Sequence, residues 1–275
     1  MAAQIFIQLD RPDGVYRPGE PLRGTCVVVA RSPLRTRAVT LHLIGDEVTT
    51  LGPNVLMTEH THPYQLSYPL WSASMEHEQL PAGEHAFTFA IGLPPGLPPT
   101  FNGELTKIAY RVEVKLDRLF LPDLRAERPV IIRVPPLTDP DKPVRASASL
   151  PGGLTLELDL PASGFLPGDH ITGALHLIGT PPAPLKALTV EVASRETGHA
   201  REFADHVEHV RVRAEIDPAQ VSGSAPYPID LPLPEDADPS FAAQHSSKTR
   251  FVRAQLALAD GRTLNAEAVI RVGQR

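Results

Sequence analysis

The second half of the chain repeats the first, with matching landmarks in the same order. Residues 16–24 (YRPGEPLRG) return as residues 165–173 (FLPGDHITG), a shift of 149 residues, and residues 38–43 return as 187–192 at the same shift. A nine-residue deletion then reduces the shift to 140 residues. We therefore expect two copies of one domain. The later matched landmarks are Phe87, Phe89, Ile91, Leu93 and Pro94 with Tyr227, Ile229, Leu231, Leu233 and Pro234, and then Phe101 and Tyr110 with Phe241 and Phe251.

The pattern within each copy predicts β-strands. The chain contains 30 prolines, about twice the usual share, and they separate short apolar runs rather than long helices. Residues 108–116 alternate strictly, so Ile108, Tyr110 and Val112 share one face. This pattern predicts an all-β protein of two tandem immunoglobulin-like antiparallel β-sandwiches. Expected strands cover 5–9, 25–29, 39–43, 85–91, 108–116, 128–134, 154–160, 171–178, 188–192, 207–216, 227–231, 251–258 and 266–272.

The length of 275 residues suits two domains of ordinary size. We place the N-terminal sandwich at 1–135 and the C-terminal sandwich at 145–275. Residues 136–144 are rich in proline, which predicts a stiff, extended linker between them. Two stretches, 71–79 and 198–206, are ambiguous between helix and strand.

Composition excludes several classes of protein. The net charge is −6 and no segment is strongly basic, so we expect no nucleic-acid partner. No apolar run reaches the ~18 residues of a spanning helix, so we expect no transmembrane segment. Cys26 is the single cysteine and cannot form an internal disulfide. With no visible secretory signal, these features predict a cytoplasmic protein.

Four motifs in order resemble the arrestin superfamily, particularly its arrestin-domain (alpha-arrestin) and bacterial sporulation-control branches. The resemblance covers residues 5–134 well and 146–272 more loosely. The motifs are Tyr16-x-Pro18-Gly19-Glu20-x-Leu22-x-Gly24, Leu43-x-Gly45-x-Glu47, Gly83-x-His85-x-Phe87-x-Phe89-x-Ile91-x-Leu93-Pro94, and Leu97-Pro98-Pro99-Thr100-Phe101-x-Gly103 leading into 108–118.

The resemblance implies an arrestin fold and a non-enzymatic adaptor or scaffold. Such a protein binds protein partners, including cytoplasmic parts of membrane proteins, in signalling, regulation or trafficking. An alternative is a structural protein that assembles into oligomers through exposed strand edges. No Pro-Pro-x-Tyr motif is present, and the chain ends at Arg275 after the last expected strand. We therefore expect neither ubiquitin-ligase recruitment nor a regulatory tail.

The repeated block has a physical interpretation. Pro18 fixes φ ahead of a turn in which Gly19 takes a positive φ. Gly24 and its counterpart Gly173 are expected where packing is close. We interpret these residues as structural.

Histidines suggest a weak metal hypothesis. In a strand, His60 and His62 would share a face, as some zinc sites require. Glu59 and Glu76 would supply oxygen ligands, and His77 and His85 are further histidines near them in the sequence. The favoured interpretation is exposed loop histidines before Pro63, and we expect no metal and no cofactor.

The remaining candidates concern binding rather than catalysis. Asp117 and Arg118 end the clearest strand and are candidates for an interdomain contact, for which a solvated strand end is the alternative. Arg111 and Lys115 are partner-binding candidates as a cationic strip, although Glu113 between them favours a neutralised face. We expect no catalytic residue, because no nucleophile motif is present and Cys26 lies in an apolar run, where a buried, inert thiol is typical.

Overall fold

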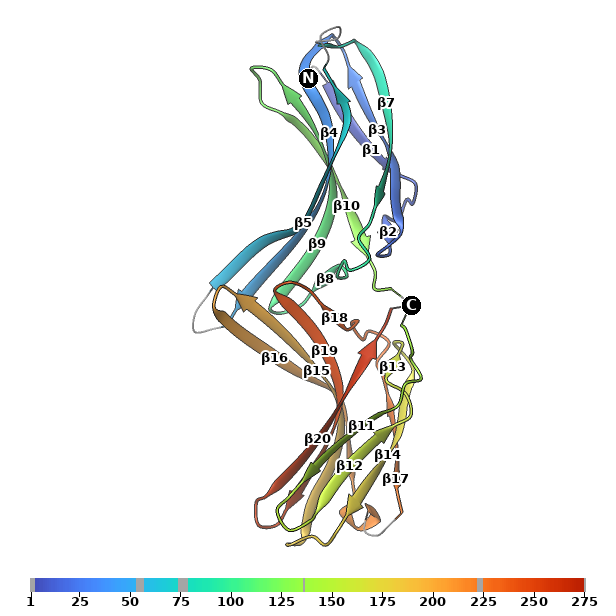
Figure 1. Cartoon of the computed structure of the whole chain (residues 1–275), viewed down its shortest axis with the longest axis vertical. Coiled ribbons are helices and arrows are strands. Elements are labelled where there is room, and N and C mark those ends of the chain that lie inside the picture. Colours follow the sequence, from blue (N-terminus) through green and yellow to red (C-terminus); the bar gives the residue numbers. More distant parts are fainter. Residues whose placement is uncertain (1–2, 53–56, 74–78, 136, 222–224, 275) are drawn as a thin grey trace. The chain divides into compact units, whose positions relative to one another are not determined.

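The protein is nearly all β-strand, as predicted. The computed structural model describes residues 3–52, 57–73, 79–135, 137–221 and 225–274. Within these ranges no helix is long and apolar enough to cross a membrane, and the helical element is a short 3-10 turn, η1 (Pro218–Val221). Two compact units form the chain (Figure 1). Unit 1 comprises 1–134, 199–203 and 243–245, and unit 2 comprises 135–198, 204–242 and 246–275. The linker over 136–144 stays a prediction.

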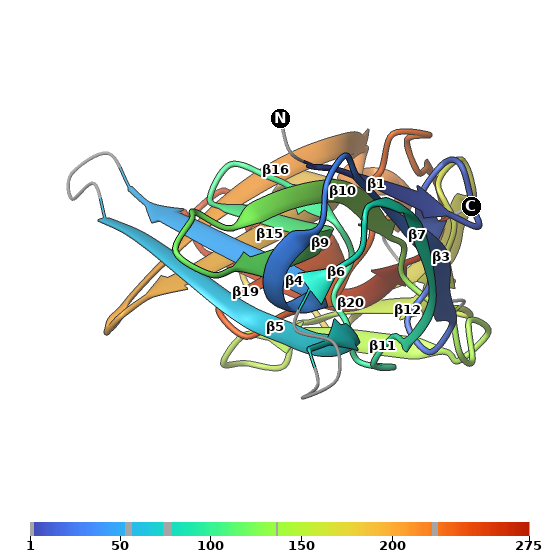
Figure 2. The same cartoon turned by 90° about the horizontal axis from the view of Figure 1, so that it is seen from above.

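Unit 1 is a sandwich of two sheets. The smaller sheet has the order β1-β3-β7, and the larger has β2-β10-β9-β4-β5, with β6 added to β4 and β8 added to β9. Figure 2 shows β5 beside β4. Pairing is antiparallel except for the short parallel pair of β2 with β10. The strands are β1 (Ala3–Leu9), β2 (Val15–Tyr16), β3 (Pro21–Ala30), β4 (Leu34–Leu51), β5 (Met57–Ser72), β6 (Gln79–Leu80), β7 (Gly83–Gly92), β8 (Phe101–Asn102), β9 (Thr106–Arg118) and β10 (Leu124–Ile132).

Unit 2 repeats this architecture. Its smaller sheet has the order β11-β12-β14-β17 and its larger sheet β13-β20-β19-β15-β16, with β18 added to β19. Leucines and valines from both sheets fill one core, among them Leu156, Leu158, Val190 and Leu256. The strands are β11 (Val144–Ser149), β12 (Thr155–Leu160), β13 (Gly164–Phe165), β14 (His170–Ile178), β15 (Leu185–Ala200), β16 (Phe203–Ile216), β17 (Tyr227–Pro232), β18 (Phe241–Ala242), β19 (Ser246–Leu258) and β20 (Thr263–Val272).

The repeat in the sequence is also a repeat of strands. β3 and β4 return as β14 and β15 at the shift of 149 residues, and β8 and β9 return as β18 and β19 at the shift of 140. The deletion therefore falls between β15 and β17, in the region of β16 and the segment that follows it. β11 has no counterpart among the described strands of unit 1.

The repeated glycine turn has the predicted geometry in both units. Gly19 has φ +84° and Gly168 has φ +85°. The amide of Glu20 donates to the carbonyl of Arg17 at 3.1 Å, and Asp169 makes the equivalent bond at 3.0 Å. A proline followed by a glycine of positive φ inside such a bond is the pattern of a type II turn. The expected positive φ is confirmed.

Close backbone packing at the second repeated glycine is also confirmed. A Cβ at Gly24 would lie 2.4 Å from the carbonyl oxygen of Gln8, and one at Gly173 would lie 2.5 Å from that of Asp159. Real Cβ atoms do not approach backbone oxygens this closely, so both positions require glycine.

β5 is a strand that the sequence analysis did not predict. His60 and His62 lie on this strand, so their predicted place in a loop was wrong, whereas their predicted exposure is confirmed. Pro63 and Pro69 each lie at or next to an irregularity in the pairing of β5 with β4. Proline has no N–H group to donate to a neighbouring strand, so within sheets it is found in edge strands and at bulges.

The two ambiguous stretches contain strand where they are described. Residues 71–72 end β5 and residue 79 begins β6, whereas 74–78 lie outside the described residues. Residues 198–206 hold the end of β15 and the start of β16.

Candidate functional site

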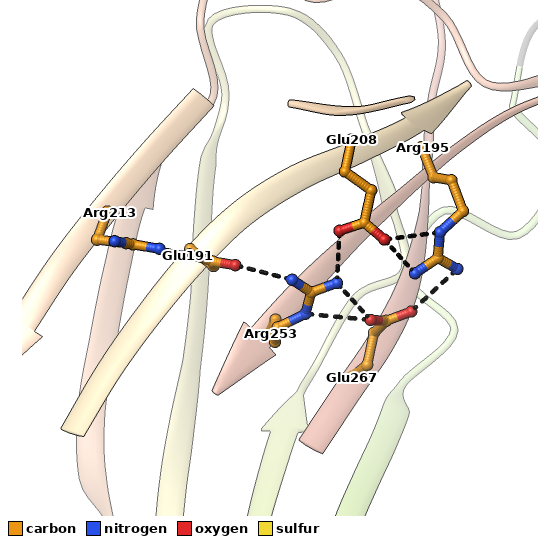
Figure 3. Close-up of polar contacts among 6 residues, drawn as sticks. All are labelled: Glu191, Arg195, Glu208, Arg213, Arg253 and Glu267. Atoms are coloured by element: carbon orange, nitrogen blue, oxygen red, sulfur yellow. Dashed lines mark hydrogen bonds and ion pairs between the residues drawn. The ribbon is translucent and has the colours of Figure 1, made fainter. Parts of the chain in front are cut away.

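The larger sheet of unit 2 carries an ion-pair network on its outer face. β19 alternates, so Val252 and Ala254 face the core while Arg253 faces outward. Neighbouring strands place acidic and basic side chains around Arg253 (Figure 3). The outer-face network consists of Glu191 and Arg195 from β15, Glu208 and Arg213 from β16, Arg253 from β19 and Glu267 from β20.

Arg253 is the centre of the outer-face network. Its Nη1 atom lies 3.1 Å from an oxygen of Glu191. Its Nη2 atom lies 2.9 Å from Glu208 and 3.0 Å from Glu267. One guanidinium therefore connects carboxylates from three other strands, an arrangement that suits the planar fork of arginine with its five donors.

Two further arginines complete the pairing. Arg195 approaches Glu208 at 2.6 Å and Glu267 at 3.7 Å, and Arg213 approaches Glu191 at 2.7 Å. Three positive and three negative side chains result in no net charge, so the outer-face network is polar but neutral.

Burial and pairing determine the charge states in the outer-face network. The side chain of Glu191 is 1% exposed and receives both Arg213 and Arg253. Hydrogen bonds from Arg253 and then Arg195 lower the pKa of Glu208. Burial opposes the charge of Arg253, but its hydrogen bonds to Glu208 and Glu267 outweigh that effect and raise its pKa. Glu208 and Arg253 are therefore both charged at neutral pH.

An aromatic ring lies beneath the outer-face network. Phe251 is fully buried although it belongs to the outer face of β19. The guanidinium groups of Arg195 and Arg253 lie 5.0 Å and 4.7 Å from its ring centroid, within cation–π range. Its partner on β20, Val269, is 53% exposed. The surface thus offers apolar area beside fixed charges.

The larger sheet of unit 1 pairs the predicted partner-binding residues internally. Arg111 contacts Asp46 and lies 3.4 Å from Glu127. Lys115 lies 3.1 Å from Asp123. The favoured expectation of a neutralised face agrees with these contacts, and a role for Arg111 and Lys115 in partner binding stays a prediction.

Asp117 and Arg118 make contacts within unit 1. The hydroxyl of Thr36 donates to the carbonyl of Asp117 at 2.5 Å, and Arg37 lies 4.0 Å from its carboxylate. The Nε of Arg118 donates to the carbonyl of Pro122 at 2.8 Å. The interdomain role suggested for this pair stays a prediction.

The histidines of β5 have a neighbour that sequence reasoning missed. His60 and His62 lie with Asp46 of β4, and the three side chains could hold a metal ion. Glu59, one of the two carboxylates suggested as oxygen ligands, is not part of this cluster. The alternation of 39–43, continued along the strand, places Asp46 on the outer face and could have been used as a signal. The sequence does not show which residues of another strand lie opposite Asp46. Glu76 and His77 lie outside the described residues.

Cys26 does not have the environment of a nucleophile. Its side chain is fully buried in unit 1. Burial raises the pKa of its thiol to about 12, so the reactive thiolate is scarce at neutral pH. The prediction that this thiol is buried is confirmed, and its inertness stays a prediction.

A shallow groove crosses the smaller sheet of unit 2. It has a volume of about 740 Å³, and Arg145, Asp159 and His176 line it. Arg145 Nη2 donates to Asp159 at 3.0 Å, and His176 lies 3.4 Å from the same carboxylate. These three side chains of the groove pair with one another.

Comparison with known proteins gives consistent matches. The family described as "Arrestin (or S-antigen), N-terminal domain" matches residues 5–136. "Arrestin domain-containing protein 17" of Caenorhabditis elegans is 24% identical over 258 residues, which cover 80% of this chain and 60% of that protein. "Arrestin domain-containing protein 1" of Mus musculus is 34% identical over 116 residues, which cover 42% of this chain and 26% of that protein. The Homo sapiens protein of that name is 35% identical over 115 residues, which cover 41% of this chain and 26% of that protein.

Proposed function

Because the chain belongs to the arrestin superfamily, we propose that it is a non-enzymatic adaptor or scaffold. It would bind protein partners in the cytoplasm, in signalling, regulation or membrane-protein trafficking. The observation that supports this most directly is the match of residues 5–136 to the arrestin N-terminal domain. The matches span 60% and 26% of the length of the first two relatives, so the activities of those whole proteins are not assigned to this chain.

The outer face of the larger sheet in unit 2 is the surface we propose for a partner. Arg195 and Arg253 are held by carboxylates and by the ring of Phe251, so they need little ordering when a partner binds. Exposed Val269 adds apolar area next to them. Protein interfaces typically combine apolar contacts with arginine and aromatic side chains.

Affinity capture with two matched variants tests this proposal. Val269→Lys places a charge in the proposed surface, whereas Ile178→Lys places the same charge at the end of β14, a residue that is 50% exposed in the smaller sheet. We expect a partner captured by wild type and by Ile178→Lys to be captured at least ~10-fold less by Val269→Lys, which corresponds to about 1.4 kcal/mol. Equal capture by all three proteins would contradict this surface.

Assembly through strand edges is the second candidate function. β16 is the last strand of its sheet and contains no proline in its 14 residues. Phe203 and Val210 on it are 48% and 45% exposed. An edge of this kind can pair with another chain through its unpaired backbone groups.

Light scattering coupled to size-exclusion chromatography separates the two functions. Assembly predicts a molar mass that rises with protein concentration above the 29.8 kDa of one chain. A mass of one chain at every concentration would contradict assembly and leave the adaptor proposal standing.

A further inference from the structure

Three potential metal ligands meet on the outer face of the larger sheet in unit 1. Asp46 is on β4, and His60 and His62 are two residues apart on β5. An irregularity in the pairing of these strands falls between Gly45 and Glu47, opposite His62. Val48 pairs with His60 and Glu47 with Thr61, so the same register places His62 opposite Asp46, beside this bulge.

The donor atoms are close enough to share one ion. His60 Nε2 lies 3.7 Å from Asp46 Oδ1, and His62 Nδ1 contacts the same oxygen. All three donor atoms lie within 4.8 Å of one another. The two imidazole rings are 4.8 Å apart with an interplanar angle of 55°, so they are not stacked. Small side-chain rotations would bring all three atoms to coordination distance.

The second oxygen of Asp46 is already held. Arg111 contacts Asp46 Oδ2, which leaves Oδ1 directed at the histidines. The positive charge of Arg111 opposes a cation nearby, but Glu127 lies 3.4 Å from Arg111 and offsets it. Residues that hold a ligand from behind in this way orient it and tune metal affinity.

We propose that Asp46, His60 and His62 bind a divalent zinc-class ion. Two imidazole nitrogens and one carboxylate oxygen suit zinc, and magnesium and calcium prefer all-oxygen sites. The histidine side chains are 55% and 50% exposed, so an ion reaches them from solvent. Three protein ligands also leave a position for water or for a ligand from another molecule. The bound ion would link β4 to the edge strand β5 and stabilise unit 1.

To test this proposal, the untagged 275-residue chain is first treated with a chelator and then titrated with zinc chloride in an isothermal titration calorimeter. We expect one site, weakened at least ~10-fold in His60→Asn and in His62→Asn. His206→Asn is the matched control, because it removes an exposed histidine from edge strand β16 in unit 2. Melting temperatures in chelator confirm that the variants fold, and only wild type and His206→Asn should gain stability with zinc.

Cobalt(II) gives a second measurement that does not depend on stability. A site with two imidazoles and a carboxylate gives low-coordinate cobalt, whose visible absorption is stronger than that of the hydrated ion. We expect this absorption in wild type and its loss in the double variant His60→Asn/His62→Asn. Zinc binding that is equally strong in the double variant, or lost equally in His206→Asn, would overturn the proposal. So would an absence of zinc binding by the wild type.

Discussion

Tyr110 in unit 1 and Arg250 in unit 2 occupy equivalent positions, 140 residues apart, and make the same contact. The Tyr110 hydroxyl donates to the carbonyl of Pro98 at 2.8 Å. The Arg250 Nε donates to the carbonyl of Asp238, which is also shifted by 140 residues, at 2.9 Å. Phe251, the aromatic residue that the sequence matched to Tyr110, instead faces outward. That match was wrong, because the strand register rather than aromatic character decides equivalence.

The residue that pairs with this position on the neighbouring strand also differs between the two units. Tyr110 pairs with Gly45, whose added Cβ would lie 2.6 Å from the tyrosine ring. Arg250 pairs with Ser194. Burial lowers the pKa of Arg250, and its Nη1 has no hydrogen-bond partner among the described residues. A buried, incompletely paired charge reduces stability.

A double-mutant cycle tests this equivalence. Arg250→Tyr alone should destabilise unit 2, because the ring meets the Cβ of Ser194. Ser194→Gly alone should cost about 0.5–1 kcal/mol through glycine in a strand. Together they recreate the pair of unit 1, and we expect a favourable coupling energy of about 1–3 kcal/mol in urea unfolding. Additive effects would contradict the equivalence.

The turn glycines should be intolerant of β-branched residues. Gly19→Val and Gly168→Val should each destabilise their own unit by at least about 1 kcal/mol, because both glycines have positive φ. Gly92→Val is the control, since a Cβ there meets no atom within 4 Å and its φ is not positive. Thermal unfolding measures the effect.

Cys26 distinguishes the two units in that experiment. It is the single cysteine and is buried in unit 1, so a thiol reagent reports opening of that unit. Labelling should accelerate in Gly19→Val and stay near the wild-type rate in Gly168→Val. Equal acceleration in both would contradict independent effects on the two units.

Removal of Arg253 should be costly. Glu191 is almost fully buried and pairs with Arg253 and Arg213 among the described residues, so Arg253→Met leaves it with Arg213. We expect the free energy of unfolding, measured with denaturant, to fall by about 3 kcal/mol. Adding Glu191→Gln to Arg253→Met should recover part of that loss, because the buried charge is removed. Arg262→Ala, which breaks an exposed pair with Asp260, should change the stability much less than Arg253→Met does. A similar cost for Arg253→Met and Arg262→Ala would show that the outer-face network contributes little.

The contribution of Glu208 should depend on pH. Its folded pKa is lowered from the usual value of 4.5, so its stabilisation is present above that pH and is lost as the pH falls through the folded pKa. Glu208→Gln should therefore be about 1 kcal/mol less stable than wild type at pH 7, after allowance for solvent screening. The difference should shrink below about pH 4.5. Melting temperatures across pH 3–7 measure it, with Glu215→Gln at an exposed position of β16 as the control.

Strands with strict alternation were predictable from sequence, and the clearest was residues 108–116 of β9. The glycine turns were predictable as well, because positive φ restricts the residue type. β5 was missed because Pro63 and Pro69 interrupt its pattern, although Tyr64, Leu66 and Tyr68 alternate between them.

The polar sites were less accessible to sequence reasoning. Glu191, Arg253 and Glu267 are far apart in the sequence and meet because three strands pair in one register. Asp46 lies opposite His62 because Val48 pairs with His60 and Glu47 with Thr61, beside a bulge that shifts the pairing by one residue. Single-sequence patterns specify faces of strands, but they do not specify which residues lie opposite one another.

The prolines of β5 have a consequence for self-association. Each removes a backbone donor from the outermost strand of its sheet, so a second chain laid against β5 would find a broken ladder. Fibril-like growth is therefore discouraged at this margin of unit 1. The same safeguard is missing from β16, so any tendency of this protein to polymerise should begin there.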